Sequence, residues 1–172
     1  LLLGILAPSI AGIFLLRAEI VHLLIAAPFQ AVTLAILPLS ALAGSIRNVR
    51  AHFGDQVFLL HSKTRLMVVV SAIDAAVTLI ASLICIHLWG LVGAAAAAGI
   101  SAVAAASVSV AFGFTRFGLT LPWAHLARIA VATLAMALLL TRLQEATSYA
   151  VLAAHIASGA AIYLGVLATL YG

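Results

Sequence analysis

Asp74 is the ionisable residue that lies deepest within an apolar run of this chain. It follows Arg65 by nine residues, a distance of about 13 Å along a helix at the standard rise per residue. Such a position is near the middle of a lipid bilayer, where a carboxylate is costly unless it is paired or protonated. The residue is therefore a candidate for cation coupling, for proton relay or for contact with a polar substrate. The structural alternative is a hydrogen-bonded pair between two helices.

Histidines are the other residues that could do chemistry, and they are scattered along the chain. The six lie at positions 22, 52, 61, 87, 125 and 155. His52 and Asp55 share a helical face, but no third ligand stands at the spacing of a metal site. The chain also has no serine–histidine–aspartate order, no paired-carboxylate motif and no phosphate-cradling glycine loop in the context that these need. We therefore predict no catalytic residue, no metal and no cofactor, and a protein that is not an enzyme.

The composition predicts that the elements around these residues lie in lipid. Apolar residues make up 66% of the chain, and only 12 of its 172 residues (8 Lys and Arg, 4 Asp and Glu) are charged. A water-soluble domain carries charge on about a quarter of its residues. The net charge of +4 is then expected to reflect basic cytoplasmic loops rather than a surface for nucleic acid. We predict membrane lipids as partners, and no nucleic acid.

Six apolar segments follow one another along the chain, which we take as a single transmembrane region over residues 1–172. Lipid offers no hydrogen bonds to backbone groups, and the segments are too long and too unalternating for the strands of a barrel. We therefore predict an all-α integral membrane protein, a polytopic bundle of about six transmembrane helices. The expected helices cover about residues 2–26, 29–47, 66–88, 91–113, 123–141 and 149–171.

The basic residues predict which side of the membrane each connection faces. Six Lys and Arg residues lie in or beside the connections 47–65 and 114–124, whereas Arg17 and Arg142 lie on the opposite side. Because cytoplasmic loops carry the excess of basic residues, both connections and both ends of the chain are expected in the cytoplasm. The connection 47–65 is long, and one of its faces is apolar. It is expected to form an interfacial amphipathic helix or a cytoplasmic extension of the flanking helices.

Two sequence features concern how the helices pack and bend. Small residues recur every four positions from Gly93 to Ser109, and side chains of that size let helix backbones approach closely. This face is expected to pack against another helix, either as a static contact or as a sliding interface. Pro8 and Pro38 each remove a backbone hydrogen bond inside an expected helix and should bend it.

Seven short stretches, in order along the chain, resemble segments of polysaccharide flippases. They include an apolar segment ahead of a helix with a Leu-Pro step, a glycine turn that leads into a small-residue helix, and a basic linker before the next helix. Together they resemble the C-terminal part of an O-antigen or exopolysaccharide flippase of the multidrug/oligosaccharidyl-lipid/polysaccharide exporter superfamily. The stretches are EIVHLLIAAPFQA (19–31), ILPL (36–39), QVFLL (56–60), KTR (63–65), GLVGAA (90–95), RFGLTLPW (116–123) and residues 128–136.

This resemblance implies a transporter of about 12–14 helices, of which the chain is expected to be the C-terminal part, since it begins with Leu1 rather than Met. Such proteins move undecaprenyl-pyrophosphate-linked oligosaccharide across the bacterial inner membrane by alternating access, in polysaccharide biosynthesis. The implied partners are this lipid-linked substrate and the N-terminal half of the same protein. The basic cavity residues of the family lie largely in that N-terminal half. Arg17, Arg47 and Asp74 are therefore substrate-binding candidates of this chain alone, and the family usually has an uncharged polar residue in place of Asp74.

Three other functions compete with this interpretation. The first is a drug or metabolite exporter coupled to protons or sodium through Asp74. The second is a membrane polysaccharide polymerase or ligase, against which the short connections on the outer side count. The third is a purely structural membrane subunit, which the absence of catalytic motifs permits.

Overall fold

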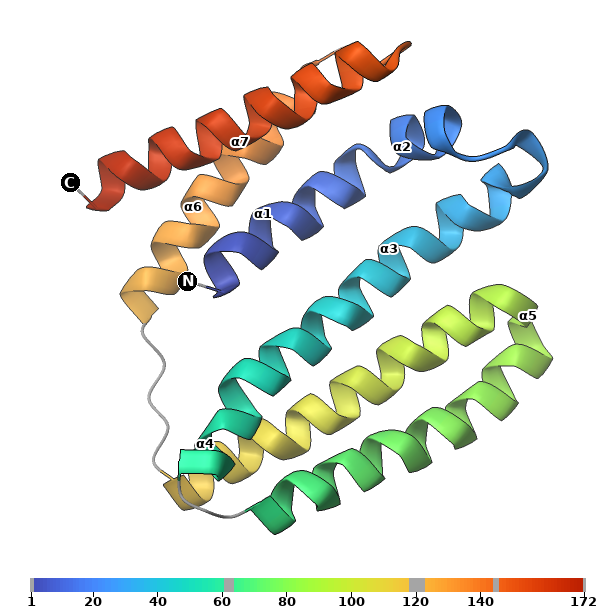
Figure 1. Ribbon diagram of the computed structural model, residues 1–172, viewed down its shortest axis with the longest axis vertical. Helices are drawn as coiled ribbons and strands as arrows, with labels where there is room; N and C mark the ends of the chain where they lie inside the picture. The colour runs from blue at the N-terminus through green and yellow to red at the C-terminus, as the bar shows by residue number, and fades with distance from the viewer. Residues whose placement is uncertain (1, 61–63, 118–122, 144–145, 172) are drawn as a thin grey trace. The chain divides into compact units, whose positions relative to one another are not determined.

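The structure is a computed structural model that describes residues 2–60, 64–117, 123–143 and 146–171. These residues are helical between short connections and contain no strand, which confirms the predicted all-α fold. Figure 1 shows the helices and labels α1 to α7. They are α1 (Leu2–Leu15), α2 (Arg17–Leu24), α3 (Ala27–Val49), the π-helix η1 (Arg50–Gly54), α4 (Asp55–Leu60), α5 (Thr64–Phe117), α6 (Trp123–Leu140) and α7 (Tyr149–Tyr171).

Several of these helices have the length and composition of membrane spans. Within the described ranges, four helical stretches are long and apolar enough to cross a membrane, and the bent pair of α1 and α2 would make a fifth. The four are α3 with η1, α5, α6 and α7. Their number and lengths are those of a multi-pass membrane protein.

The third and fourth predicted helices form the two arms of α5, which folds back on itself at Gly90 (Figure 1). Gly90 has a φ of 57° and a ψ of −133°, a backbone conformation that is open to glycine and strained for residues with a Cβ atom. The reversal brings the arms together close to the bend. A Cβ atom on Gly93 would overlap the backbone carbonyl of Cys85 on the first arm. The predicted helices 66–88 and 91–113 therefore form a helical hairpin that two glycines make possible.

The small-residue face of the second arm of α5 is buried, as predicted. Its members contact different neighbours in turn: the first arm of α5 near the bend, then α3 and α4 further along. The face thus packs against other helices within the hairpin and beside it, because small side chains allow close approach. Its members are Gly93, Ala97, Ser101, Ala105 and Ser109.

The first predicted helix, 2–26, is not a single straight helix. It consists of α1 and α2, which are bent by 67° relative to one another. The break lies at Leu16, whose φ of −92° and ψ of 8° are not helical, and Pro8 lies within α1 ahead of it. The break lets the side chain of Leu16 enter an apolar core while Arg17 remains exposed. Burial of one apolar side chain, rather than the proline, thus accompanies the bend.

The second predicted helix, 29–47, ends later than expected. The helical backbone runs on through α3, η1 and α4, with Val49 and Asp55 both in the right-handed helical region. Much of the predicted connection 47–65 is therefore an extension of this helix, the second of the two alternatives above. The arginines at its start belong to a helix rather than to a loop, and Lys63 lies outside the described residues. Which side of the membrane the connections face stays a prediction.

Contacts divide the chain into two compact units. The first comprises Leu1–Pro38 and Pro122–Gly172, and the second comprises Leu39–Leu121, so the boundary falls at Pro38 inside α3. The apolar core of the first unit comes from the α1–α2 break, α6, the segment after α6, and α7. That of the second comes from α4 and both arms of α5. The buried residues of these core clusters are Leu16, Ala132, Met136, Leu140, Ala146, Leu152 and Tyr163 in the first unit, and Phe58, Val70 and Ala105, with a separate cluster of Ala81, Cys85 and Ala97, in the second.

We expect Gly93→Ala to destabilise the α5 hairpin, because the added Cβ meets a backbone carbonyl that cannot rotate away. Overpacking of this kind costs about 1–3 kcal/mol. Gly99→Ala is the matched control on the same arm, since open space surrounds that position, and it should change stability by no more than about 1 kcal/mol. The measurement is the free energy of unfolding of the full-length protein in mixed micelles. Equal effects of the two substitutions would contradict close packing at Gly93.

Candidate functional site

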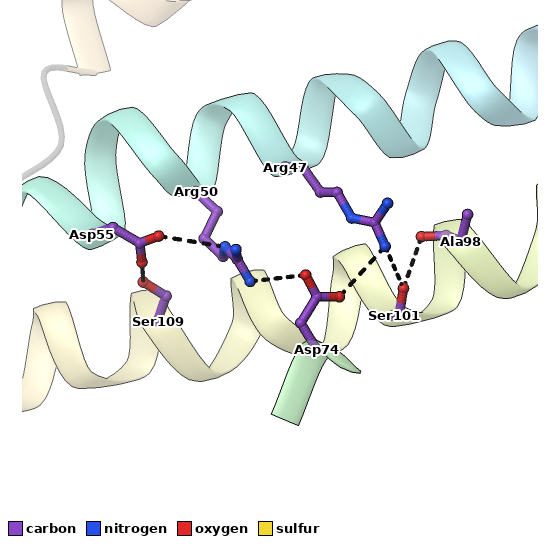
Figure 2. A network of polar contacts seen from close by, with 7 residues as sticks. All are labelled: Arg47, Arg50, Asp55, Asp74, Ala98, Ser101 and Ser109. Carbon is purple, nitrogen blue, oxygen red and sulfur yellow. Dashed lines mark hydrogen bonds and ion pairs between the residues drawn. The ribbon is translucent and has the colours of Figure 1, made fainter. Parts of the chain in front are cut away.

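Two of the predicted site residues, Arg47 and Asp74, lie together within the second unit (Figure 2). Nη2 of Arg47, on α3, donates to Oδ1 of Asp74, on the first arm of α5, at 3.5 Å. The same nitrogen donates to Oγ of Ser101, on the second arm, at 2.9 Å. The Ser101 hydroxyl in turn donates to the carbonyl oxygen of Ala98 at 3.1 Å. One guanidinium group therefore connects α3 to both arms of the hairpin.

Arg50 extends this network toward α4. Its Nη1 donates to Oδ2 of Asp74 at 3.2 Å, so the two oxygens of Asp74 face two different arginines. Its Nε lies 3.6 Å from Oδ2 of Asp55, which is the distance of an ion pair rather than of a hydrogen bond. Oδ1 of Asp55 accepts a hydrogen bond of 3.3 Å from the hydroxyl of Ser109. As Figure 2 shows, Arg50 lies between the two carboxylates.

The π-helix η1 explains why Arg50 and Asp55 face one another. Residues five apart in an α-helix differ by about 140° around the axis, given 3.6 residues per turn. In η1 the amide of Asp55 donates to the carbonyl oxygen of Arg50, the five-residue step of a wider π turn. This step brings both side chains to the same side of the helix. A single turn of unusual geometry thus places the second carboxylate beside the arginine.

A close approach of η1 to the second arm of α5 completes the packing. Gly54, the last residue of η1, is buried, and a Cβ atom there would overlap the side chain of Ser109. The absence of a side chain at Gly54 therefore leaves room for the serine that binds Asp55. Phe58 follows on α4 and is buried against Val70 and Ala105. Apolar packing lies directly next to the ion pairs.

The network carries no net formal charge, because two arginines face two carboxylates. The side chains of Arg50, Asp55 and Asp74 are 12%, 12% and 16% exposed, whereas Arg47 is 39% exposed. Charges this poorly hydrated are tolerated when they are paired, and removal of one partner leaves the other uncompensated. The Nε atoms of Arg47 and Arg50 are both buried without a hydrogen-bond partner. Of the four charged side chains in this network, Arg47 is the most exposed.

This arrangement determines what each group could bind. Both oxygens of Asp74 already face arginines, so a cation would have to displace a guanidinium group to reach it. Arg47 has free surface, and a guanidinium group binds phosphate and carboxylate oxygens well. Within the part of the chain that the structure describes, no three His, Cys, Asp or Glu side chains gather where a metal ion could bind. The exposed part of the Arg47 guanidinium group is therefore suited to bind an anion.

The third predicted site residue, Arg17, lies in the other unit. Arg17 is exposed at the start of α2 and belongs to the first unit, whereas Arg47 and Asp74 belong to the second. Sequence reasoning also missed Arg50 and Asp55 as members of the site. Arg47 and Arg50 are three residues apart and therefore share a helical face. This spacing is the signal that could have identified Arg50 from the sequence.

Comparisons of this chain with protein-family models, with curated proteins and with solved structures gave no match. The resemblance of short stretches to polysaccharide flippases thus stays a prediction. The contacts described above provide the physical basis for a functional proposal.

We expect Arg50→Gln to destabilise the protein more than Arg47→Gln does. Arg50 faces two carboxylates and is largely buried, and loss of one partner of a buried pair costs about 3–5 kcal/mol. Arg47 is more exposed, so its pairing contributes about 1 kcal/mol or less. The free energy of unfolding of both variants in mixed micelles checks this order. A reversed order would mean that Arg47, not Arg50, holds the carboxylates in place.

We also expect Gly54→Ala to be less harmful when Ser109 is shortened. In the parent the new Cβ meets the Ser109 hydroxyl, and Ser109→Ala removes that atom. Neighbouring substitutions of this type couple by about 0.5–3 kcal/mol. A double-mutant cycle of the two substitutions, read as free energy of unfolding, measures the coupling. Additive effects would show that η1 and the second arm of α5 are not in contact there.

Proposed function

We propose that the chain is the C-terminal part of a carrier that moves undecaprenyl-pyrophosphate-linked oligosaccharide across the bacterial inner membrane by alternating access. Two observations agree with this proposal. The helices are long and apolar enough to cross a membrane several times, and the flippase-like stretches are in order along the chain. A carrier of this kind needs a polar site for the head group, an apolar flank for the lipid tail, and helices that can bend.

The single observation that carries the proposal is that Arg47 is both held in place and partly exposed. Its guanidinium group is held at one side by Asp74 and Ser101, while 39% of the side chain remains exposed. A pyrophosphate group requires a cation of this kind, positioned in advance among apolar helices. Its partners fix the orientation of the guanidinium group, and its exposed part is free to contact phosphate oxygens.

The last two helices supply surface suited to the lipid tail. Over their described residues, α6 and α7 carry large apolar side chains on exposed positions and no acidic residue. Such faces are compatible with acyl chains and with a polyprenyl chain alike, since both are hydrocarbon. The exposed apolar residues include Val131, Leu134 and Leu138 on α6 and Ile156 and Leu164 on α7.

Coupled export of drugs or metabolites through Asp74 is the weaker alternative. Its carboxylate already serves two arginines, and a coupling cation would have to replace them. The pairing thus corresponds to the structural alternative for Asp74 that the sequence left open. We accordingly assign Asp74 the role of holding the arginines, and Arg47 the role of contacting the substrate.

The test is complementation in cells of the native host that lack the chromosomal copy, with full-length protein carrying Arg47→Ala or Arg47→Lys. We expect Arg47→Ala to lower surface polysaccharide at least about 10-fold, the effect of a lost contact of about 1.4 kcal/mol, and lipid-linked oligosaccharide to accumulate inside. Arg47→Lys should restore part of the activity, because it keeps the charge but loses the planar fork of donors.

Arg142→Ala is the matched control, because this arginine is also exposed and its side chain has no polar partner among the described residues. It should restore surface polysaccharide fully at equal membrane expression. Full activity of Arg47→Ala would remove Arg47 from the substrate site. If the unaltered protein also failed to restore polysaccharide in its own host, the proposed substrate class would be wrong.

A further inference from the structure

In the first unit, α7 binds the broken α1–α2 segment on both sides of its break. The hydroxyl of Tyr163 donates to the carbonyl oxygen of Gly4 on α1, at 2.6 Å. The hydroxyl of Tyr149 donates to the carbonyl oxygen of Leu23 on α2, at 2.7 Å. Between these two contacts, Nδ1 of His155 lies 3.2 Å from Oε2 of Glu19. Three polar contacts from one helix therefore hold the bend, and the middle one is titratable.

The middle pair is buried and lies next to the break. The side chains of His155 and Glu19 are 11% and 13% exposed, and Glu19 follows Leu16, the residue at the break, by three positions. His155 belongs to the buried face of α7, together with Leu152, Gly159 and Tyr163. Ionisable groups at such positions in apolar helices mark proton or ion pathways by default.

The other ionisable groups of the helices that pack here are occupied elsewhere or exposed. The described residues of α1 contain none. On α2, Arg17 is exposed and His22 bonds to Gln30. On α6, His125 and Arg128 both lie against the ring of Tyr171. Among the described residues, the remaining groups are Tyr149 and Tyr163, bonded as above, and Arg142, which is exposed after α6.

We infer that His155 and Glu19 form a proton-binding site that controls the bend between α1 and α2. With one proton between them, as imidazolium and carboxylate, the pair carries no net charge and attracts α2 to α7. Loss of that proton to water leaves a neutral imidazole and a bare carboxylate, which requires hydration. Gain of a second proton leaves an imidazolium beside a neutral acid. Both changes weaken the contact, because burial penalises a net charge.

The backbone at the break can respond to such a change. The amide of Leu16 donates to the carbonyl oxygen of Gly12, and the amide of Ile20 donates to that of Leu16, both at 2.9 Å. The bend thus lies between helical segments whose hydrogen bonds reach the break itself. A rotation of the ψ angle of Leu16 from 8° toward the helical value of about −42° would straighten the segment. Release of α2 from His155 is what would permit this rotation.

The test measures the bend directly, in full-length protein without substrate, so it does not depend on what the carrier moves. Spin labels are placed at Ile5→Cys on α1 and Leu24→Cys on α2, both 60% exposed, with Cys85 and any other cysteine replaced by serine. Distances between the labels are recorded in lipid nanodiscs at about pH 5 and about pH 8, the range over which histidine pairs change charge. We expect the distance distribution to differ between the two pH values.

Glu19→Gln and His155→Gln should each give one distribution at both pH values, since either change removes a titratable partner. His22→Asn is the matched control on α2 and should keep the pH response of the parent. A distribution that is independent of pH in the parent would overturn the inference, as would a pH response that survives both substitutions. Should the variants not fold, the side-chain ¹⁵N resonances of His155 in the unaltered pair decide: a shift over the same pH range supports the site, and constant resonances reject it.

Discussion

The pairing of buried charge is the constraint on which both units of this protein depend. All three acidic residues that the structure describes, Glu19, Asp55 and Asp74, face a basic side chain. An ionised carboxylate among apolar helices costs several kcal/mol unless it is compensated, so each acid restricts which helices can lie next to it. Such pairs add little net stability compared with apolar packing. Their role here is to fix which faces of the helices meet.

Small residues are what make these pairings possible. Side-chain hydrogen bonds require helices to approach until their donors and acceptors are about 3 Å apart. Gly54 and Gly93 permit that approach because neither has a side chain in the way. Ser101 and Ser109, on the same buried face of α5, then supply hydroxyl groups to the ion pairs. Gly54 and the small-residue face of α5 together therefore provide both the space and part of the polar chemistry.

The apolar helices and the buried small-residue face could be predicted from the sequence, because lipid exposure and close packing leave direct traces in composition and spacing. The break at Leu16 could not, since it depends on tertiary burial, whereas Pro8, the local signal, lies inside a continuous α1. Asp74 and Arg47 were identifiable as polar residues within apolar segments. Asp55 was not, because the π turn moves it onto a face that α-helical spacing does not assign to it.

The π turn also couples the ionic and the apolar contacts of the α3–α4 segment. One residue added to or removed from a helix rotates everything after it by about 100°. The wide turn takes up one extra residue and so offsets that rotation. If the same residues closed into a regular α-helix, Asp55 would turn away from Arg50 and Phe58 would turn away from Val70 together. Loss of one residue between Arg50 and Gly54 would instead leave Arg50 and Asp55 four positions apart, the spacing at which side chains share an α-helical face, and so would keep both contacts.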